Sequence, residues 1–436
     1  MNLSRAFNPI LVASISIQMI LPSFASASSS SSMMSQINAA QDLTLESFAD
    51  SNAMSGVSLD DLITTTKSQN FSVRQEAERV FQAKKQVKVA VGNLLPHIRP
   101  GGILAIAFGG PSGIIGVVGD LLPFLFPSNW FKARATKRLL EAERDSFSSL
   151  MGNEVFEVES LYYAVSRDQI LAGLIDSHLA WLDQIYNRLR VEEIAGSLPG
   201  GSADYFRFNT LKLKDDRSNL TELLSIESQA LKFAAGLPTD GTGLQLQTMA
   251  LPDLNDAPAK DAKDYLQISR DRSYELSALG WLIEASRYSR KAVVFGFLDP
   301  SSEQAIGFSL APQIQIAKSQ TRELQVLQES TGSLISQRVI DSITLHNESI
   351  SRYKLAAETS STVQRELTRL IQRHDSGDVT LDSKVFIDEL SSLQNDLLLS
   401  EVNKLSQASR NLVAKSRLNR LTLQGYYGDL DSIQVQ

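Results

Sequence analysis

Residues that commonly perform catalysis or bind metals are scarce in this sequence. It contains no cysteine, and its four histidines, His97, His178, His346 and His374, lie far apart. Without cysteine the chain cannot form a disulfide, a thiolate zinc site, a cysteine nucleophile or an acylated cysteine anchor. The Gly-x-Ser-x-Gly, phosphate-loop and His-Glu-x-x-His patterns of common enzymes are also absent. We therefore predict a protein that is not an enzyme and that needs no cofactor or metal.

Aspartates at two predicted turns are the charged residues best placed for a function. Asp204 follows the turn at residues 198–202, and Asp375, Asp378 and Asp382 surround the turn at residues 374–378. In a symmetric oligomer each acid would be repeated in a ring, which favours cations and repels itself. The alternative is that these aspartates only cap helices and solvate turns. The first interpretation predicts a constriction at the tip of the molecule.

Length, composition and net charge limit the class of protein that this chain can belong to. The chain has 436 residues, of which 43% are hydrophobic, so a large core can be buried. Its 42 Lys and Arg against 49 Asp and Glu give a net charge of −7. This balance argues against nucleic-acid binding, because no excess of basic residues exists to neutralise phosphates.

The N-terminus has the pattern of an export signal. Arg5 precedes an apolar stretch at residues 10–21, and Ala25-Ser26-Ala27 has the small residues that signal peptidase requires. A membrane anchor is the alternative, but this stretch is too short to cross about 30 Å of hydrocarbon. We predict a signal peptide over residues 1–27, a flexible leader over 28–57, and a location in the bacterial outer membrane and periplasm.

Helical periodicity dominates the rest of the chain. Apolar residues recur every three or four positions from Phe147 to Leu189, and Gln169 is the one polar member of this seam. The mean spacing of 3.5 residues is typical of a coiled coil. The members are Phe147, Met151, Val155, Val158, Tyr162, Val165, Gln169, Ala172, Ile175, Leu179, Leu182, Tyr186 and Leu189.

The helical pattern occurs twice, which indicates a tandem duplication. Each half predicts an entering helix, an apolar hairpin, a long helix, a turn and a returning helix. The predicted helices span residues 59–93, 132–198 and 204–235 in the first half and 261–290, 315–373 and 381–423 in the second. We assign a first repeat to residues 58–238, a linker to 239–260, a second repeat to 261–423 and a tail to 424–436.

Two apolar segments at equivalent places in the repeats are predicted to be β-hairpins. Residues 101–126 include one charge, Asp120, and two β-prone runs around a Gly and Pro turn. The second hairpin is predicted from runs 293–298 and 305–310. A buried core segment is the alternative for both. The residues predicted to contact a membrane are Ile103, Ile106, Phe108, Ile114, Ile115, Val118 and the interfacial Trp130.

Several short motifs in this order resemble the TolC family of outer-membrane efflux channel proteins, over about residues 43–423. The motifs are Ser58 to Leu62 with Ala83 and Val87 before Asn93 to Pro96, Leu125-Phe126 before Lys132 to Arg134, Ile314 to Lys318, Leu231 to Pro238, and Gly377 with Leu381 and Val385.

The resemblance implies a passive conduit for efflux or type I secretion. It implies a homotrimer whose helices form a tunnel and whose strands share a twelve-stranded barrel, working with a periplasmic adaptor and an inner-membrane transporter. The fold class is mainly α, with long antiparallel coiled-coil helices in a tandem duplicated repeat. The first hairpin has room for two membrane strands of about 9–11 residues, but the second has about six residues on each side. Neither alternates polar and apolar residues, so we expect a small or degenerate β-barrel.

A different class of protein would also account for long helices with an apolar tongue. A helical pore-forming protein or an envelope scaffold could dock to a membrane through such a hairpin and have no role in efflux. The two classes differ in their number of hairpins, because a toxin needs one and a tandem channel repeat has two. The sequence shows two, which favours the channel.

Overall fold

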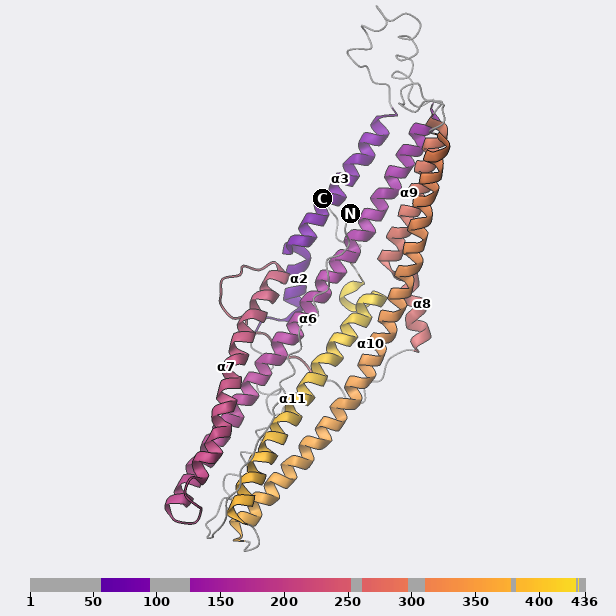
Figure 1. Cartoon of the computed structure of the whole chain (residues 1–436). Coiled ribbons are helices and arrows are strands. Elements are labelled where there is room, and N and C mark those ends of the chain that lie inside the picture. The colour runs from indigo at the N-terminus through magenta and orange to yellow at the C-terminus, as the bar shows by residue number, and fades with distance from the viewer. Residues whose placement is uncertain are drawn as a thin grey trace, which may run out of the picture.

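The computed structural model describes residues 56–94, 126–251, 261–296, 310–377, 382–428 and 430. These residues form an elongated bundle of helices (Figure 1). Two helices, α6 (Pro127–Ile194) and α10 (Leu310–Asp375), contain 68 and 66 residues. At 1.5 Å per residue each is about 100 Å long, so each of them runs the length of the bundle.

The other helices occur in matching sets, one in each half of the chain. Helices α2 (Leu59–Gln69) and α3 (Phe71–Gly92) have 11 and 22 residues, and so do α8 (Ala262–Arg272) and α9 (Tyr274–Phe295). The returning helices α7 (Ser202–Ala235) and α11 (Ser383–Thr422) have 34 and 40 residues. This correspondence agrees with the tandem duplication predicted from the sequence.

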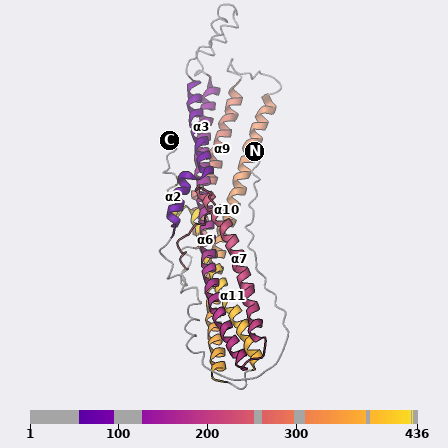
Figure 2. The same ribbon diagram turned by 90° about the vertical axis from the view of Figure 1, so that its left-hand side faces the viewer.

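The helices lie side by side in one layer rather than around a central core. In the half of the bundle that contains the turns, the order is α7, α6, α11 and α10. In the other half the order is α3, α6, α9 and α10. Helices α3 and α7 follow one another along one edge, and α10 forms the other edge throughout (Figures 1 and 2).

The predicted seam on α6 is the core of this layer. Ten of its thirteen residues are buried, and Met151, Val155 and Val158 are fully so. The polar member, Gln169, donates a hydrogen bond from Nε2 to the carbonyl of Leu244 at 2.6 Å and accepts one from the amide of Leu246 at 3.2 Å. The one polar position of the seam therefore holds the segment that follows α7.

Both entering helices contain a break that was not predicted. The predicted helix 59–93 divides at Asn70, whose side chain caps α3 by accepting a hydrogen bond from Val73. The predicted helix 261–290 divides at Ser273, which caps α9 through the amide of Leu276. Asn and Ser are strong N-cap residues, so each ends one helix and begins the next.

The second predicted hairpin begins too early. Residues 293–295 belong to α9, so the prediction of a strand over 293–298 was wrong for these residues. Val293, Val294 and Phe295 favour strands intrinsically, but packing overrides this preference. The Phe295 ring lies 5.6 Å from the ring of Phe131 on α6, centroid to centroid. Residues 297–309 and the first predicted hairpin, 101–125, lie outside the described residues.

Segments predicted as linker and tail pack against the helices. Leu246 and Met249 are buried, and Val57 exchanges backbone hydrogen bonds with Gln245 and Gln247 at 2.9 and 3.1 Å. After α11, the short helix η4 (Gly425–Tyr427) places Tyr427 in a core between α2, α3, α6 and α9. These packed segments surround the middle of the bundle.

Candidate functional site

Both turns lie at one end of the bundle, here named the tip (Figure 1), and three of the predicted aspartates lie there. Asp204 is exposed in the first turn of α7. Asp375 is the last residue of α10, and Asp382 precedes α11. Asp378 lies outside the described residues. The structure therefore places three of the four aspartates at one end of the molecule.

A network of charged side chains joins the two turns at the tip. Arg188 on α6 contacts Glu192 at 3.0 Å, and a second nitrogen of its guanidinium lies 3.7 Å from Asp375 Oδ1 on α10. Nε2 of His374 lies 3.2 Å from Glu192 Oε2. The ring of His374 also stacks on Phe386 of α11, with centroids 3.9 Å apart. Three helices from both repeats are thus linked at the tip.

The electrostatics of this network favour a charged Glu192. Burial alone would raise the pKa of this carboxyl, but hydrogen bonds from His374 and Arg188 outweigh burial and hold the pKa below its usual value. The Asp375 side chain is 7% exposed and faces Arg188. Asp375 is therefore a partner in an ion network, whereas Asp204 is accessible to solvent.

The turns themselves are fixed by capping interactions. Glu193 accepts hydrogen bonds from the amides of Gly201 at 2.6 Å and Ala203 at 3.0 Å, at the start of α7. Gly201 has a φ of 93°, which glycine adopts at little cost. Asp382 accepts a hydrogen bond from the amide of Lys384 at 2.8 Å and caps α11. Carboxylates at helix N-termini also interact favourably with the helix dipole.

Sequence reasoning missed Arg188, Glu192, Glu193 and His374. Arg188 and Glu192 have the i,i+4 spacing of a helical ion pair, and this signal was available in the sequence. The pairing of Glu192 with His374 was not, because 182 residues separate them. Only the fold brings them together.

At the opposite end, Trp130 lies in the first turns of α6 and is 47% exposed. The remaining residues predicted to contact a membrane, Ile103, Ile106, Phe108, Ile114, Ile115 and Val118, lie outside the described residues. Among the helices that the structure describes, none has an apolar stretch of the length needed to cross a bilayer.

Two carboxyl groups in the middle of the bundle, Glu159 on α6 and Glu227 on α7, have raised pKa values. Glu159 is 3% exposed and accepts hydrogen bonds from Tyr427 and Ser416. Burial raises the pKa of Glu159 to about 7, although the Tyr427 hydrogen bond opposes this shift. On α7, burial and the nearby Asp168 carboxylate raise the pKa of Glu227 to about 7. Burial is the largest cause of the raised pKa in both groups.

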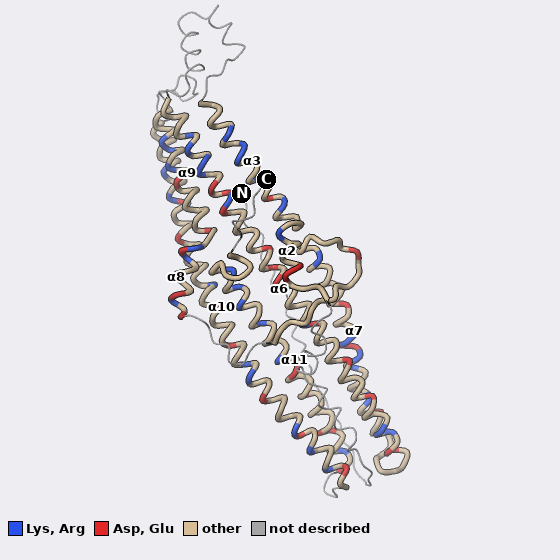
Figure 3. Tube along the Cα trace, turned by 180° about the vertical axis from the view of Figure 1, so that it is seen from behind, with Lys and Arg blue, Asp and Glu red and all other residues tan. Residues whose placement is uncertain are grey.

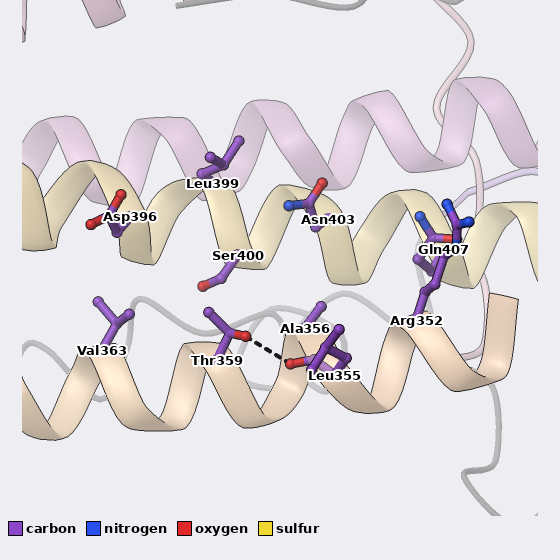
Figure 4. Close-up of a pocket in the computed structure, with 10 residues that line it drawn as sticks. All are labelled: Arg352, Leu355, Ala356, Thr359, Val363, Asp396, Leu399, Ser400, Asn403 and Gln407. Atoms are coloured by element: carbon purple, nitrogen blue, oxygen red, sulfur yellow. Dashed lines mark hydrogen bonds between the residues drawn. The ribbon is translucent and has the colours of Figure 1, made fainter. Parts of the chain in front are cut away.

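A groove of about 450 Å³ runs between α10 and α11 (Figure 4). It is open to solvent, with Leu355 and Leu399 exposed on its walls. Close by, Glu401 is buried with its partners Ser360 and Lys404, whose ammonium lies 3.2 Å from Glu401 Oε2. The lining residues are Arg352, Leu355, Ala356, Thr359, Val363, Asp396, Leu399, Ser400, Asn403 and Gln407. These side chains form no catalytic arrangement.

No cluster of histidine and acidic side chains in the described ranges has the geometry of a metal site. No protein-family model and no curated protein matches the sequence. Solved structures do match the fold.

Three solved structures illustrate this similarity. The chain matches CusC with a TM-score of 0.68 and 13% identity, over 84% of this chain and 92% of CusC. It matches the outer-membrane channel OprN with a TM-score of 0.68 and 13% identity, over 94% and 99%. For the open state of the MtrE outer-membrane channel of Neisseria gonorrhoeae the TM-score is 0.65 at 14% identity, over 84% and 89%.

The chain thus has the fold of bacterial outer-membrane channels. More specifically, the fold is TolC-like, which confirms the resemblance and the mainly α fold class predicted from the sequence. Because the sequences are so different, the similarity concerns the fold alone.

Proposed function

We propose that this protein is an outer-membrane channel, a passive conduit in an efflux or type I secretion system. The observation that carries the proposal is the single layer of helices with two unpartnered edges. A lone layer leaves apolar side chains in water along both edges, and these need partners.

The two edges differ, so they suit a ring of copies. One edge exposes Phe71 on α3 with Phe208 and Phe233 on α7, and the other exposes Val326 and Leu355 on α10. Contact between unlike edges is heterologous, and such contacts close into a ring when the rotation allows it. TolC-like structures imply a ring of three, working with a periplasmic adaptor and an inner-membrane transporter.

Assembly and conductance test this proposal. Light scattering in detergent should give three times the protomer mass, and the protein should conduct ions in a planar bilayer. Phe208→Asp and Val326→Asp, one on each edge, should each reduce trimer formation. Leu399→Asp is a matched control, because Leu399 is exposed on α11, which is not an edge helix. A monomer that never conducts would contradict the proposal.

The predicted hairpin residues fit this proposal as the membrane-facing part. If Ile106 and Ile115 face lipid at mid-bilayer, Arg at either position should cost about 2–4 kcal/mol. Unchanged stability and unchanged membrane association of both variants would favour a buried core segment instead.

We also propose that the tip aspartates attract cations to the entrance of the channel. Neutralising Asp378 and Asp382 to Asn should reduce cation preference in planar-bilayer conductance, more at low than at high salt. Asp382 caps α11, so Asp204→Asn serves as a second variant that removes an exposed charge. Equal selectivity of all variants would assign these acids to turn structure alone.

A further inference from the structure

The end of the bundle opposite the tip is strongly basic. We define the basic collar as residues 81–94, 127–140, 285–296 and 310–322, which are the ends of α3, α6, α9 and α10. These four ends lie together at the top of Figure 1. The collar contains no Asp or Glu, although the whole chain has a net charge of −7. Its basic residues are Lys84, Lys85, Lys88, Lys132, Arg134, Lys137, Arg138, Arg287, Arg290, Lys291, Lys318 and Arg322.

Most of these basic side chains are free to meet an external anion. All except Arg138 and Arg290 belong to exposed residues, and they occur on all four helices (Figure 3). Of the basic collar residues, Arg138 alone forms an ion pair within the described part of the chain. Its partner is Glu284, at 2.8 Å. Burying or crowding so many like charges without anions would be unfavourable. Exposed cations gathered in this way attract anions to this end of the bundle.

Aromatic rings are interleaved with the cations. The ammonium of Lys291 lies 5.8 Å from the Phe131 ring and 5.6 Å from the Tyr288 ring, and Lys85 lies 4.6 Å from the Phe81 ring. Phe131 also stacks against Tyr288, with ring centroids 6.4 Å apart. Aromatic rings beside Lys and Arg are typical of the boundary between a membrane and water.

The sequence beyond the collar indicates which anion lies there. Residues 100–119, which connect α3 to α6, contain no charged residue and are largely apolar. Over residues 95–125 and 297–309 together, the charged residues are Arg99, Asp120, Asp299 and Glu303. These acids are too few to neutralise the collar. A surface that offers both an apolar phase and a dense layer of anions is a membrane containing anionic lipid.

We propose that the basic collar binds the phosphate headgroups of anionic phospholipids in the membrane leaflet that faces the helical bundle. This inference rests on the proposed function as a membrane channel. Each Lys or Arg held near an anionic lipid surface adds to the attraction, so the ten exposed collar cations together would fix the depth of the bundle against the membrane. The attraction falls with salt, because it acts within a Debye length.

Vesicle binding by the full-length protein tests the collar. The probes are vesicles of phosphatidylcholine alone and of phosphatidylcholine mixed with phosphatidylglycerol, each at low and high salt. The collar variant combines Lys84→Gln, Lys88→Gln, Lys132→Gln and Lys137→Gln. The control variant combines Arg190→Gln, Lys212→Gln, Lys354→Gln and Arg365→Gln, which neutralises the same number of exposed basic residues outside the collar.

At low salt, wild type and control should bind the mixed vesicles at least tenfold more tightly than phosphatidylcholine alone, and high salt should remove most of this difference. The collar variant should lose a large part of this preference, because four of the ten exposed collar cations are neutralised, while its trimer mass and conductance persist. If wild type binds both vesicles equally and still conducts, the collar proposal fails and the channel proposal stands. A wild type that associates with neither vesicle contradicts both proposals. Unchanged lipid preference in the collar variant, with altered ion selectivity, would overturn the collar proposal and place these cations along the lumen.

Discussion

Each repeat of the chain has a joint, which is the place where its returning helix meets its entering helix. The two joints are held by different interactions. At the joint of α3 and α7, the amide of Asn70 donates hydrogen bonds to the Ala234 carbonyl at 2.7 Å and to Glu154 at 2.8 Å. At the joint of α9 and α11, Arg420 donates to Glu275 at 2.7 Å and to the Ser149 carbonyl at 2.9 Å. A neutral amide performs in one repeat what an ion pair performs in the other.

A glycine lies at each joint, and the two glycines have different roles. Gly236 follows α7 with a φ of 76°, and a Cβ there would lie 2.5 Å from the Gln69 carbonyl carbon. Gly152 lies inside α6 with the Arg420 side chain against it, so a Cβ would lie 2.5 Å from Arg420 Nε. The first glycine allows two backbones to approach, and the second makes room for a side chain. Duplicated architecture therefore does not require duplicated residues.

Of the substitutions at the two joints, Arg420→Ala should lower the free energy of unfolding most. Arg420→Ala deletes a buried guanidinium and leaves Glu275 without its cation, so we expect a loss of about 3–4 kcal/mol in unfolding free energy. Chemical denaturation in detergent, followed by circular dichroism, measures this loss. Arg420→Lys should recover part of it, because it retains the charge without the planar hydrogen-bonding group. If Arg420→Ala is as stable as wild type, the ion pair does not hold the second joint.

Glu159, which accepts hydrogen bonds from Ser416 of α11 and Tyr427 of η4, should make stability depend on pH. Its pKa is about 7 in the fold, against an ordinary value of 4.5. Because the folded pKa is the higher one, the stabilisation is complete below pH 4.5 and is lost as pH rises through about 7. The loss should amount to about 3 kcal/mol.

Glu159→Gln isolates this contribution. The amide cannot ionise, so the fall in melting temperature between acid and neutral pH should become shallower. A residual slope is expected from Glu227, whose pKa is also about 7, and Glu227→Gln is the matched variant on α7. A profile in Glu159→Gln as steep as that of wild type would show that this carboxyl does not titrate in the window.

How far the sequence predicts these joints depends on the interaction. The seam on α6 and the two long helices follow from local periodicity, so they were predicted. The breaks at Asn70 and Ser273 were not, because the residues on both sides favour helix and the caps resemble ordinary polar positions. Arg420 and Ser149 are 271 residues apart, and no local pattern connects them. The same limit applies at the tip, where His374 and Glu192 meet only in the folded chain.

The effect of Gly152→Ala on stability should change sign when Arg420 is replaced by alanine. In the wild type the added methyl group collides with Arg420, and overpacking of this kind costs about 2 kcal/mol. In an Arg420→Ala background the collision is gone, and alanine is about 1 kcal/mol better than glycine inside a helix. A double-mutant cycle of melting midpoints measures the coupling. Additive effects of the two substitutions would show that Gly152 has no part in accommodating Arg420.

The smallest expected difference in stability between the joints concerns their cap residues, Asn70 and Ser273. Both cap a helix, but Asn70 also bonds to α7, whereas the second hydrogen bond of Ser273 goes to Glu275 within its own helix. Asn70→Ala should therefore cost about 2 kcal/mol and Ser273→Ala about 1 kcal/mol. Asn70→Asp retains the cap acceptor yet brings a carboxylate to Glu154, 2.8 Å from the present amide nitrogen. Its melting temperature should therefore recover in acid, where one carboxyl takes up a proton, whereas that of Asn70→Ala should not. Equal losses in Asn70→Ala and Ser273→Ala, with no recovery of Asn70→Asp in acid, would mean that Asn70 acts only as a cap and that the first joint is held by its glycine and apolar contacts.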